Sequence, residues 1–388
     1  MAARCKLEMA FSSAVAGVFT LSSALDGPDV LADVSLSDGT FTDISGDAQD
    51  PYQVVFGTDS LMSAIQAASL SVTVARIDDP GYWNPNNPAS PLAGSLPGLT
   101  AMRPVRLTET LNGTPYPVFT GYSARGTWDS DSLSCLLYCE DFLLWASRVY
   151  PIFATGPTTM GELFKTLVLS VDPTLTPIAD RGIDLPAMVF DGSQSVTQIL
   201  ASLLPVDLGT VFVMRDGTPV YRQADYALSQ DPAATVTITE QASVERGGFD
   251  VANFYTRATV NGVTAIDAAA ELDYGRADNP EITSALVSNS AGLAQELVQR
   301  GGAANKPVGF TLADVDDTTL ALMLNSLPLS VYTVDDPYAG TTGDVIAQRL
   351  EHTISAAWHE LAFSCLSRPE RAFTLSSALD GPDVIRWP

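Results

Sequence analysis

The sequence predicts a mainly β protein with a small α+β insert in its middle. Strand-like alternation of apolar and polar residues dominates both ends of the chain, and turns rich in Pro, Asn and Gly separate these segments. Two stretches with apolar residues at helical spacing lie between the β-rich ends. The chain has 388 residues, which suits two to four domains.

The composition narrows the classes of function. Lys and Arg number 20 against 45 Asp and Glu, a formal net charge of −25. Such an acidic surface repels phosphate, which argues against a DNA-binding enzyme. Hydrophobic residues make up 46% of the chain, which excludes wholesale disorder. Four cysteines are too few for a disulfide scaffold, and two histidines exclude a His-rich metal site.

The first residues predict a strand rather than a secretion signal. Apolar and other residues alternate from residue 5 to residue 11, and Glu8 interrupts the approach to the mildly apolar stretch 9–19. No apolar run approaches the roughly 18 residues that a membrane helix needs. We therefore expect a protein made in the cytoplasm, with reduced cysteines and no membrane insertion.

The first third of the chain predicts strands around one long loop. Residues 70–75 alternate branched apolar and small polar side chains, and the segment 78–98 contains five prolines. Residues 105–110 and 116–120 flank Asn112-Gly113, a strong hairpin signal, and 132–138 resembles another strand. Asn112-Gly113-Thr114 is also a glycosylation sequon, but we interpret it as a turn because no secretory signal precedes it.

The middle of the chain predicts two helices and a hairpin. Helical spacing covers residues 158–168 and 195–204, and Pro205 is expected to stop the second helix. Strands 211–215 and 218–222 flank the turn Asp216-Gly217. These features define the α+β insert.

Strands return after the insert, with one helix among them. Residues 235–239 and 258–260 predict strands, with Asn261-Gly262 as a turn after the second. A helix over 291–300 is capped by Gly301-Gly302, and strands over 344–354 and 358–366 end the pattern. The predicted domains are 1–148, 149–232, 233–310 and 311–388. The last is a C-terminal β segment that is expected to pack back against the body of the protein.

An internal repeat links the two ends of the chain. The twelve residues FTLSSALDGPDV occur at 19–30 and again, unchanged, at 373–384. Upstream, the segment 8–12 parallels 360–364. The copies suggest two β-modules that carry the same strand and surface segment in equivalent places; the alternative is a recent DNA duplication without a structural role.

No catalytic, cofactor-binding or metal-binding residue is assigned from the sequence. The only candidate bases are His352 and His359, on adjacent strands of one predicted hairpin. His359 shares the parity of Leu361 and Phe363, so we expect it to face a core or an interface as a hydrogen-bonded structural histidine.

Other motifs also predict structure rather than chemistry. The segment 121–126 (GYSARG) misses the nucleophile-elbow spacing by one residue. Cys135 and Cys139 lack the further ligands of a zinc site, which favours core packing. Asp314, Asp316 and Asp317 lack the glycine and glutamate of a Ca²⁺ loop and predict a solvated acidic loop. The pair Asp78-Asp79 carries almost no information among 45 acidic residues.

Several motifs follow one another in a distinctive order. They are 68–75 (ASLSVTVA), 79–88 (DPGYWNPNNP), 90–92 (SPL), 99–107 (LTAMRPVRL), 116–122 (YPVFTGY), 137–146 (LYCEDFLLWA), 209–213 (GTVFV) with 216–217 (DG), and 253–260 (NFYTRATV). This order resembles the minor tail, or baseplate hub, proteins of tailed bacteriophages. Cys139-Glu140-Asp141 departs mildly from the family, where a small residue and Asp form the turn. The resemblance spans most of the chain.

The resemblance implies two tube-like β-barrel modules and a smaller α+β domain, a hub-type architecture that assembles as a trimer. Three chains with two similar modules each would match a six-fold tail tube. The implied function is a structural hub in the virion, at the tail tip, that adapts the tube to the tip or fibres and forms part of the DNA channel. An acidic lumen would let DNA slide without specific binding.

The implied partners are the tail tube or distal tail protein ring, the tail tip or fibre proteins and the tape measure protein, with no cofactor. Two alternatives are a tail-associated cell-wall hydrolase and a carbohydrate-binding adhesin. In the adhesin, exposed Tyr82 and Trp83 on the Pro/Asn-rich loop would stack on sugar, although aromatic residues more often pin such a loop to the body of the protein.

Overall fold

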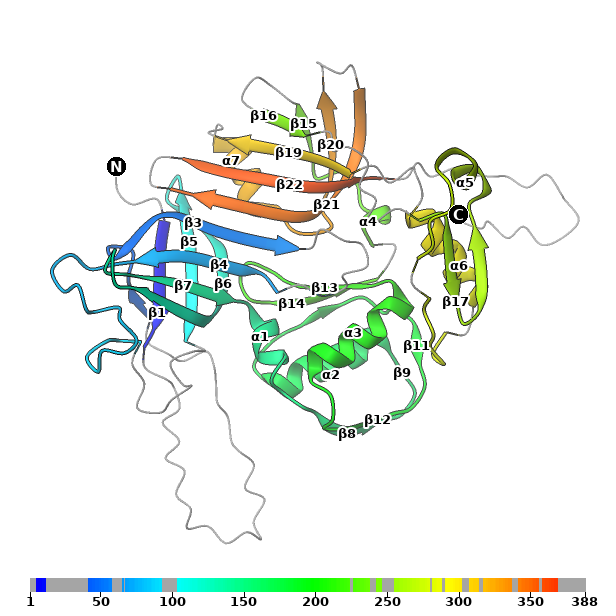
Figure 1. Cartoon of the computed structure of the whole chain (residues 1–388), viewed down its shortest axis with the longest axis horizontal. Helices are drawn as coiled ribbons and strands as arrows, with labels where there is room; N and C mark the ends of the chain where they lie inside the picture. The colour runs from blue at the N-terminus through cyan, green and yellow to red at the C-terminus, as the bar shows by residue number, and fades with distance from the viewer. Residues whose placement is uncertain are drawn as a thin grey trace, which may run out of the picture.

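The computed structural model describes residues 5–11, 41–57, 65, 67–92, 103–223, 226–237, 242–245, 255–279, 281–287, 290–301, 307–313, 317–336, 341–355 and 358–368. Within these ranges the fold is β-rich and has three visible parts, which are a large sheet, an α+β insert and a small helix-backed hairpin (Figure 1).

The large sheet has thirteen strands drawn from both ends of the chain. They are β1 (Cys5–Ala10), β2 (Phe41–Asp43), β3 (Ala48–Gly57), β4 (Ser69–Val74), β5 (Pro104–Leu111), β6 (Thr114–Asp129), β7 (Ser134–Glu140), β15 (Ala234–Thr237), β16 (Ala242–Glu245), β19 (Pro307–Ala313), β20 (Val331–Asp336), β21 (Thr341–Ile354) and β22 (His359–Ser367). The main path runs β16-β19-β22-β21-β3-β4-β7-β6-β5-β1-β2, with β20 and β15 branching from β21.

Alternation explains why these segments form strands. In β4 every second residue is buried, and β5 buries Val105, Leu107, Glu109 and Leu111 while the residues between them are more exposed. The turn between β5 and β6 places Asn112 at φ 51° and Gly113 at φ 81°, the conformation that this dipeptide favours. The predicted hairpin is therefore confirmed.

Strand β21 joins the N-terminal and C-terminal strands into one sheet. Residues 341–346 pair with β20, and residues 349–354 pair with β3. The change of partner coincides with a bulge between Ala347 and Arg349 in the ladder with β22. Gly57 ends β3 at this point with φ 79°, and a Cβ atom there would lie 1.9 Å from the carbonyl oxygen of Gln348. Only glycine allows the two backbones to approach this closely.

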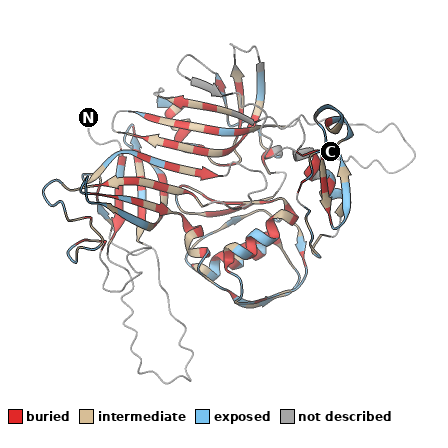
Figure 2. Ribbon diagram, in the orientation of Figure 1, coloured by how far each residue is buried: buried red, intermediate tan, exposed pale blue. Residues whose placement is uncertain are grey.

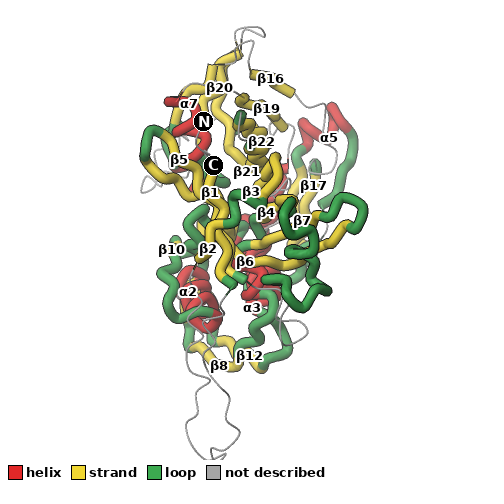
Figure 3. The backbone as a smooth tube through the Cα atoms, turned by 90° about the vertical axis from the view of Figure 1, so that its left-hand side faces the viewer, coloured by secondary structure: helices red, strands yellow, loops and turns green. Residues whose placement is uncertain are grey.

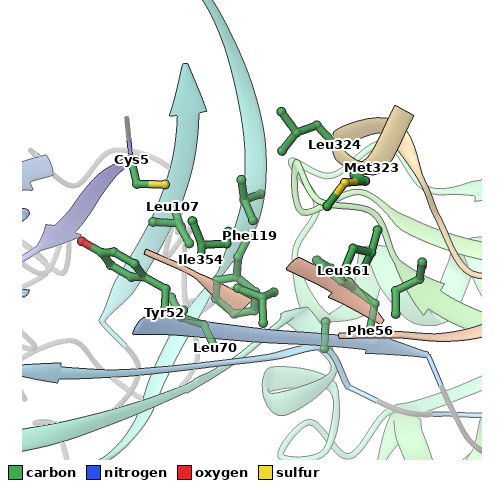
Figure 4. Packing of buried hydrophobic residues seen from close by; sticks show 14 of the residues in the cluster. Cys5, Tyr52, Phe56, Leu70, Leu107, Phe119, Met323, Leu324, Ile354 and Leu361 are labelled. Atoms are coloured by element: carbon green, nitrogen blue, oxygen red, sulfur yellow. The ribbon is translucent and has the colours of Figure 1, made fainter. Parts of the chain in front are cut away.

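One hydrophobic core lies along the inner face of this sheet. Residues from β1, β3, β4 and β5 pack with residues from β21, β22 and α7 (Asp317–Asn325) (Figure 4). Phe310 and Phe363 stack with ring centroids 4.3 Å apart. Figure 2 shows the alternation of buried and more exposed residues along the strands. The two ends of the chain thus share one core, because their strands are neighbours in the sheet.

The insert packs two helices against short strands, below the large sheet in Figures 1 and 3. Its elements are α1 (Phe142–Ala146), β8 (Ile152–Thr155), β9 (Thr158–Thr159), α2 (Met160–Val171), β10 (Ile178–Ala179), β11 (Asp184–Leu185), β12 (Met188–Asp191), α3 (Val196–Asp207), β13 (Thr210–Val213), β14 (Pro219–Arg222) and the short α4 (Tyr226–Ser229). The apolar faces of α2 and α3 form a second core with Tyr221 of β14.

The third part is the hairpin of β17 (Arg257–Val260) and β18 (Val263–Ile266), with α5 (Ala268–Tyr274) after it and α6 (Ser290–Gly301) packed on it. Ala258, Val260 and Leu297 belong to its small core. The predicted Asn261-Gly262 turn is confirmed, since both residues have positive φ.

The mainly β class with an α+β insert is confirmed, with differences in detail. Among the described strands no ladder closes the sheet into a barrel, so the two tube-like barrels stay a prediction, as do the domain limits. The prediction that Pro205 stops its helix is wrong, because α3 continues to Asp207 and ends at Leu208 with φ 51°. Proline removes only one backbone donor in this last turn, while Leu203 and Leu204 hold the helix in the core.

The C-terminal third contains more helix than expected, since α5 and α7 accompany the predicted α6. The repeated segments 19–30 and 373–384 lie outside the described residues. Of the paralleled upstream segments, residues 8–10 lie in β1 and residues 360–364 in β22, and both belong to the large sheet.

Candidate functional site

Four polar side chains form a continuous hydrogen-bonded chain inside the protein. Arg215 Nη2 lies 2.9 Å from His352 Nε2, His352 Nδ1 lies 2.8 Å from His359 Nε2, and His359 Nδ1 lies 2.8 Å from Glu109 Oε2. The four residues are at most 4% exposed. We call this group the buried polar chain.

Three parts of the sequence supply the buried polar chain. Glu109 occupies an inward position of β5, between Leu107 and Leu111. His352 of β21 and His359 of β22 point to the same face, because His352 is opposite Leu361 and His359 is opposite Ile354. Arg215 follows β13 in the turn of the insert hairpin.

The donor and acceptor roles follow from the chemistry of the two ends. An arginine can only donate, so His352 Nε2 accepts. Neutral His352 then carries its proton on Nδ1 and donates to Nε2 of His359. His359 in turn donates from Nδ1 to the Glu109 carboxylate. The two histidines are neutral links between a buried cation and a buried anion.

Arg215 has further partners that hold it in place. Its Nη2 donates to the carbonyl oxygens of Met323 at 2.9 Å and Ser326 at 2.7 Å, and its guanidinium lies 5.3 Å from the ring centroid of Phe56. Met323 lies in the last turn of α7 and Ser326 directly follows the helix, where the helix dipole favours a cation. The insert is thereby tied to α7 and to the large sheet.

Burial and charge shift the pKa values of this group. Burial lowers the pKa of Arg215 to about 10, which still leaves the guanidinium charged at neutral pH. The pKa of His352 lies well below its usual value, first because of burial and then because of the neighbouring Arg215 and His359. His352 is therefore neutral near pH 7, in agreement with the hydrogen-bond directions.

This geometry is suited to holding the insert against the large sheet rather than to catalysis. His352 and His359, the only histidines of the chain, are 0% and 3% exposed, so neither contacts solvent-borne substrate. The expectation that His359 faces the core as a hydrogen-bonded residue is confirmed. Arg215 and Glu109 escaped the sequence analysis. Glu109 occupies an inward-facing position of an otherwise apolar alternation, which could have predicted a buried carboxylate. No local pattern around Arg215 predicts its burial.

The other sequence candidates also lie in structural positions. The segment 121–126 runs inside β6, and Ser123 is buried with its hydroxyl accepting from the backbone N–H of Arg103. Cys135 and Cys139 are buried in β7, where burial raises their pKa values to about 11 and about 12, so both are protonated thiols in the core.

The acidic candidates do not come together. Asp314 and Asp316 lie outside the described residues. Asp317 starts α7 rather than belonging to a loop, and its Oδ2 accepts from Asn112 Nδ2 at 2.9 Å. Asp78 and Asp79 are exposed in the loop after β4. Within the described ranges, no three His, Cys, Asp or Glu side chains gather as metal ligands would.

The Pro/Asn-rich loop is fastened to the sheet by its aromatic residues. Trp83 is 1% exposed, and its Nε1 donates to Asp47 Oδ2 at 3.0 Å. Asp47 also pairs with Arg76, whose guanidinium lies 3.7 Å from the ring centroid of Tyr82. Trp83 thus pins the loop to the protein, as expected of an aromatic residue in such a loop. Its burial argues against the exposed Trp83 that the adhesin alternative requires.

Solved structures share this architecture. The 43 kDa tail protein of prophage MuSo2 from Shewanella oneidensis is 12% identical, with a TM-score of 0.55 over 84% of this chain and 94% of that chain. The tail protein from Neisseria meningitidis MC58 is 15% identical, with the same TM-score and coverage. The chain shares the fold of these tail proteins. The resemblance inferred from the order of the motifs is thus confirmed at the level of the fold.

Comparisons at the level of sequence found no match. No protein-family model matches the chain, and no curated protein matches it in sequence. In the part of the chain that the structure describes, every helix is too short or too polar to cross a membrane.

Proposed function

We propose that this chain is a structural component of a phage tail, a virion protein that acts as the hub of the tail tip or baseplate. The observation that carries the proposal is the shared fold, which covers 84% of this chain and 94% of each of two tail proteins. Identities of 12% and 15% leave little besides the architecture in common, so the proposal rests on a fold that these two tail proteins use.

The proposed assembly is a homotrimeric ring between the tail tube, or the distal tail protein ring, and the tip or fibre proteins, near the tape measure protein. The lumen of this ring forms part of the DNA channel. The net charge of −25 supports this role, because carboxylates along a lumen would repel phosphate and let DNA pass without specific binding. No covalent chemistry is proposed, in keeping with the burial of both histidines.

The first test is the mass of the purified full chain in solution. Light scattering after size-exclusion chromatography is expected to give three times the 41.0 kDa of one chain. The second is gold-labelled antibody on intact particles, expected to mark the tail tip. A chain that stays monomeric at high concentration and is missing from the particles contradicts the proposal. Clearing of cell-wall suspensions by the purified chain would instead support the hydrolase.

A further inference from the structure

The two histidines of the buried polar chain have no place for an additional proton. If His359 became positively charged, both of its ring nitrogens would donate, and His352 Nδ1 would have to accept. His352 would then carry its proton on Nε2, where it meets the N–H of Arg215. If His352 took the proton instead, the same N–H groups would face each other. Either protonation breaks the contact between His352 and Arg215.

The surroundings offer no countercharge for a second cation. Glu109 of β5 is the only carboxylate that an observed contact joins to the pair in the described structure, and it already balances Arg215. Tyr332 of β20 donates from its hydroxyl to Ser326 Oγ, and burial raises its pKa, as it does for Cys365 of β22. Both are therefore neutral. From α7 only backbone carbonyl groups face Arg215, and from β3 the ring of Phe56.

We propose that the buried polar chain is an acid-sensitive latch, in which protonation of the histidine pair releases the Arg215 turn of the insert from the sheet and from the end of α7. A second positive charge in this enclosed space repels Arg215, and water must enter to solvate it. Arg215 is the movable end, because it sits in the turn between β13 and β14, whereas the histidines and Glu109 belong to central strands.

The consequence is a local opening that precedes global unfolding. Release frees the β13–β14 turn and the carbonyl groups at the end of α7. The core of α2 and α3, which includes Val211, Val213 and Tyr221 of the hairpin strands, does not depend on these bonds. It stays closed, so the opening is confined to residues 214–218. The inference concerns this chain in any assembly and stands apart from the proposed tail function.

Amide hydrogen exchange of the full chain, read by mass spectrometry at pH 7.5 and 5.5 and corrected for the intrinsic rate, tests the latch. We expect the opened turn to admit one proton on a histidine with an ordinary pKa. Between pH 7.5 and 5.5 this lowers the protection of residues 214–218, the turn between β13 and β14, by about tenfold, and by up to about a hundredfold for two protons. Residues 160–171 of α2 and 69–74 of β4 are expected to keep their protection.

Two variants separate the latch from general acid sensitivity. His352→Gln offers an oxygen acceptor to Arg215 but cannot take a proton, so the pH effect in residues 214–218 is expected to shrink. Arg215→Met is expected to expose the same turn at both pH values. Asp141 is no rival explanation. Burial raises its pKa to about 7, so the folded state binds its proton more readily than the unfolded chain, and acid stabilises it.

Equal protection of residues 214–218 at both pH values in the wild-type chain would overturn the latch, and this measurement needs no variant. Equal losses in α2 and β4 would do the same, because they indicate global unfolding. An undiminished pH effect in folded His352→Gln would place the titrating group elsewhere and would also overturn the proposal.

Discussion

Trp83 shows how strongly the surroundings of a residue determine its role. On a loop dense in Pro and Asn, an aromatic side chain is a candidate for ligand stacking. In the structure the indole is buried, contacts Phe11 and Tyr82, and donates to Asp47. The aromatic residue therefore stabilises the loop instead of offering it to a ligand.

Truncation of Trp83 distinguishes the two roles. We expect Trp83→Ala to lower the free energy of unfolding by about 3–5 kcal/mol, because it leaves a large cavity and removes the bond to Asp47. Tyr82→Ala is the matched control. Tyr82 is half-buried and stacks on Arg76, so its loss is expected to cost about 1 kcal/mol. Urea denaturation measures both. Unchanged stability of Trp83→Ala together with lost glycan binding would restore the adhesin.

At the level of elements, the sequence predicted local turns but not the pairing of strands that are far apart in the chain. The dipeptides Asn112-Gly113 and Asn261-Gly262 lie at the turns where they were predicted, because positive φ is a local demand on two residues. The bulge of β21 and the close approach of Gly57 to Gln348 depend on strands far apart in the chain. No sequence window contains both partners.

The β5–β6 turn allows a clean test of this backbone demand. A Cβ atom at Gly113 would meet no heavy atom within 4 Å, so Gly113→Ala probes only the φ of 81°. We expect a loss of about 1–2 kcal/mol in the free energy of unfolding. Gly46→Ala is the control, since that site is equally open and its φ is not positive. It is expected to be neutral or to stabilise by up to about 1 kcal/mol. Equal effects at both positions would contradict the turn argument.

At the scale of the whole molecule, the net negative charge opposes the compact fold. The net charge of −25 spreads over a fold whose two ends share one sheet and one core. Mutual repulsion among the carboxylates opposes this compact state. Ion pairs such as Arg106 with Glu8 offset only part of it, because the basic residues number 20 against 45 acidic ones.

Salt is therefore expected to stabilise the protein. Between 0.01 and 0.1 M NaCl the Debye length falls from about 30 to about 10 Å, which screens the net repulsion. We expect the melting temperature to rise by a few degrees, measured by calorimetry at pH 7.5. A further increase above about 0.3 M should change little. A fall in melting temperature would mean that the attractive ion pairs outweigh the repulsion.

The sequence by itself determined the β-rich class, the two main insert helices, the hairpin turns and the inward direction of His359. These depend on periodicity and on residues that are neighbours in the chain, which a single sequence displays. Only the tertiary structure decided that β21 pairs with β3, that Trp83 is buried, and that Glu109 and Arg215 complete the buried polar chain. Glu109 and His359 are 250 positions apart, and such contacts arise from the way whole strands pack, not from any local pattern.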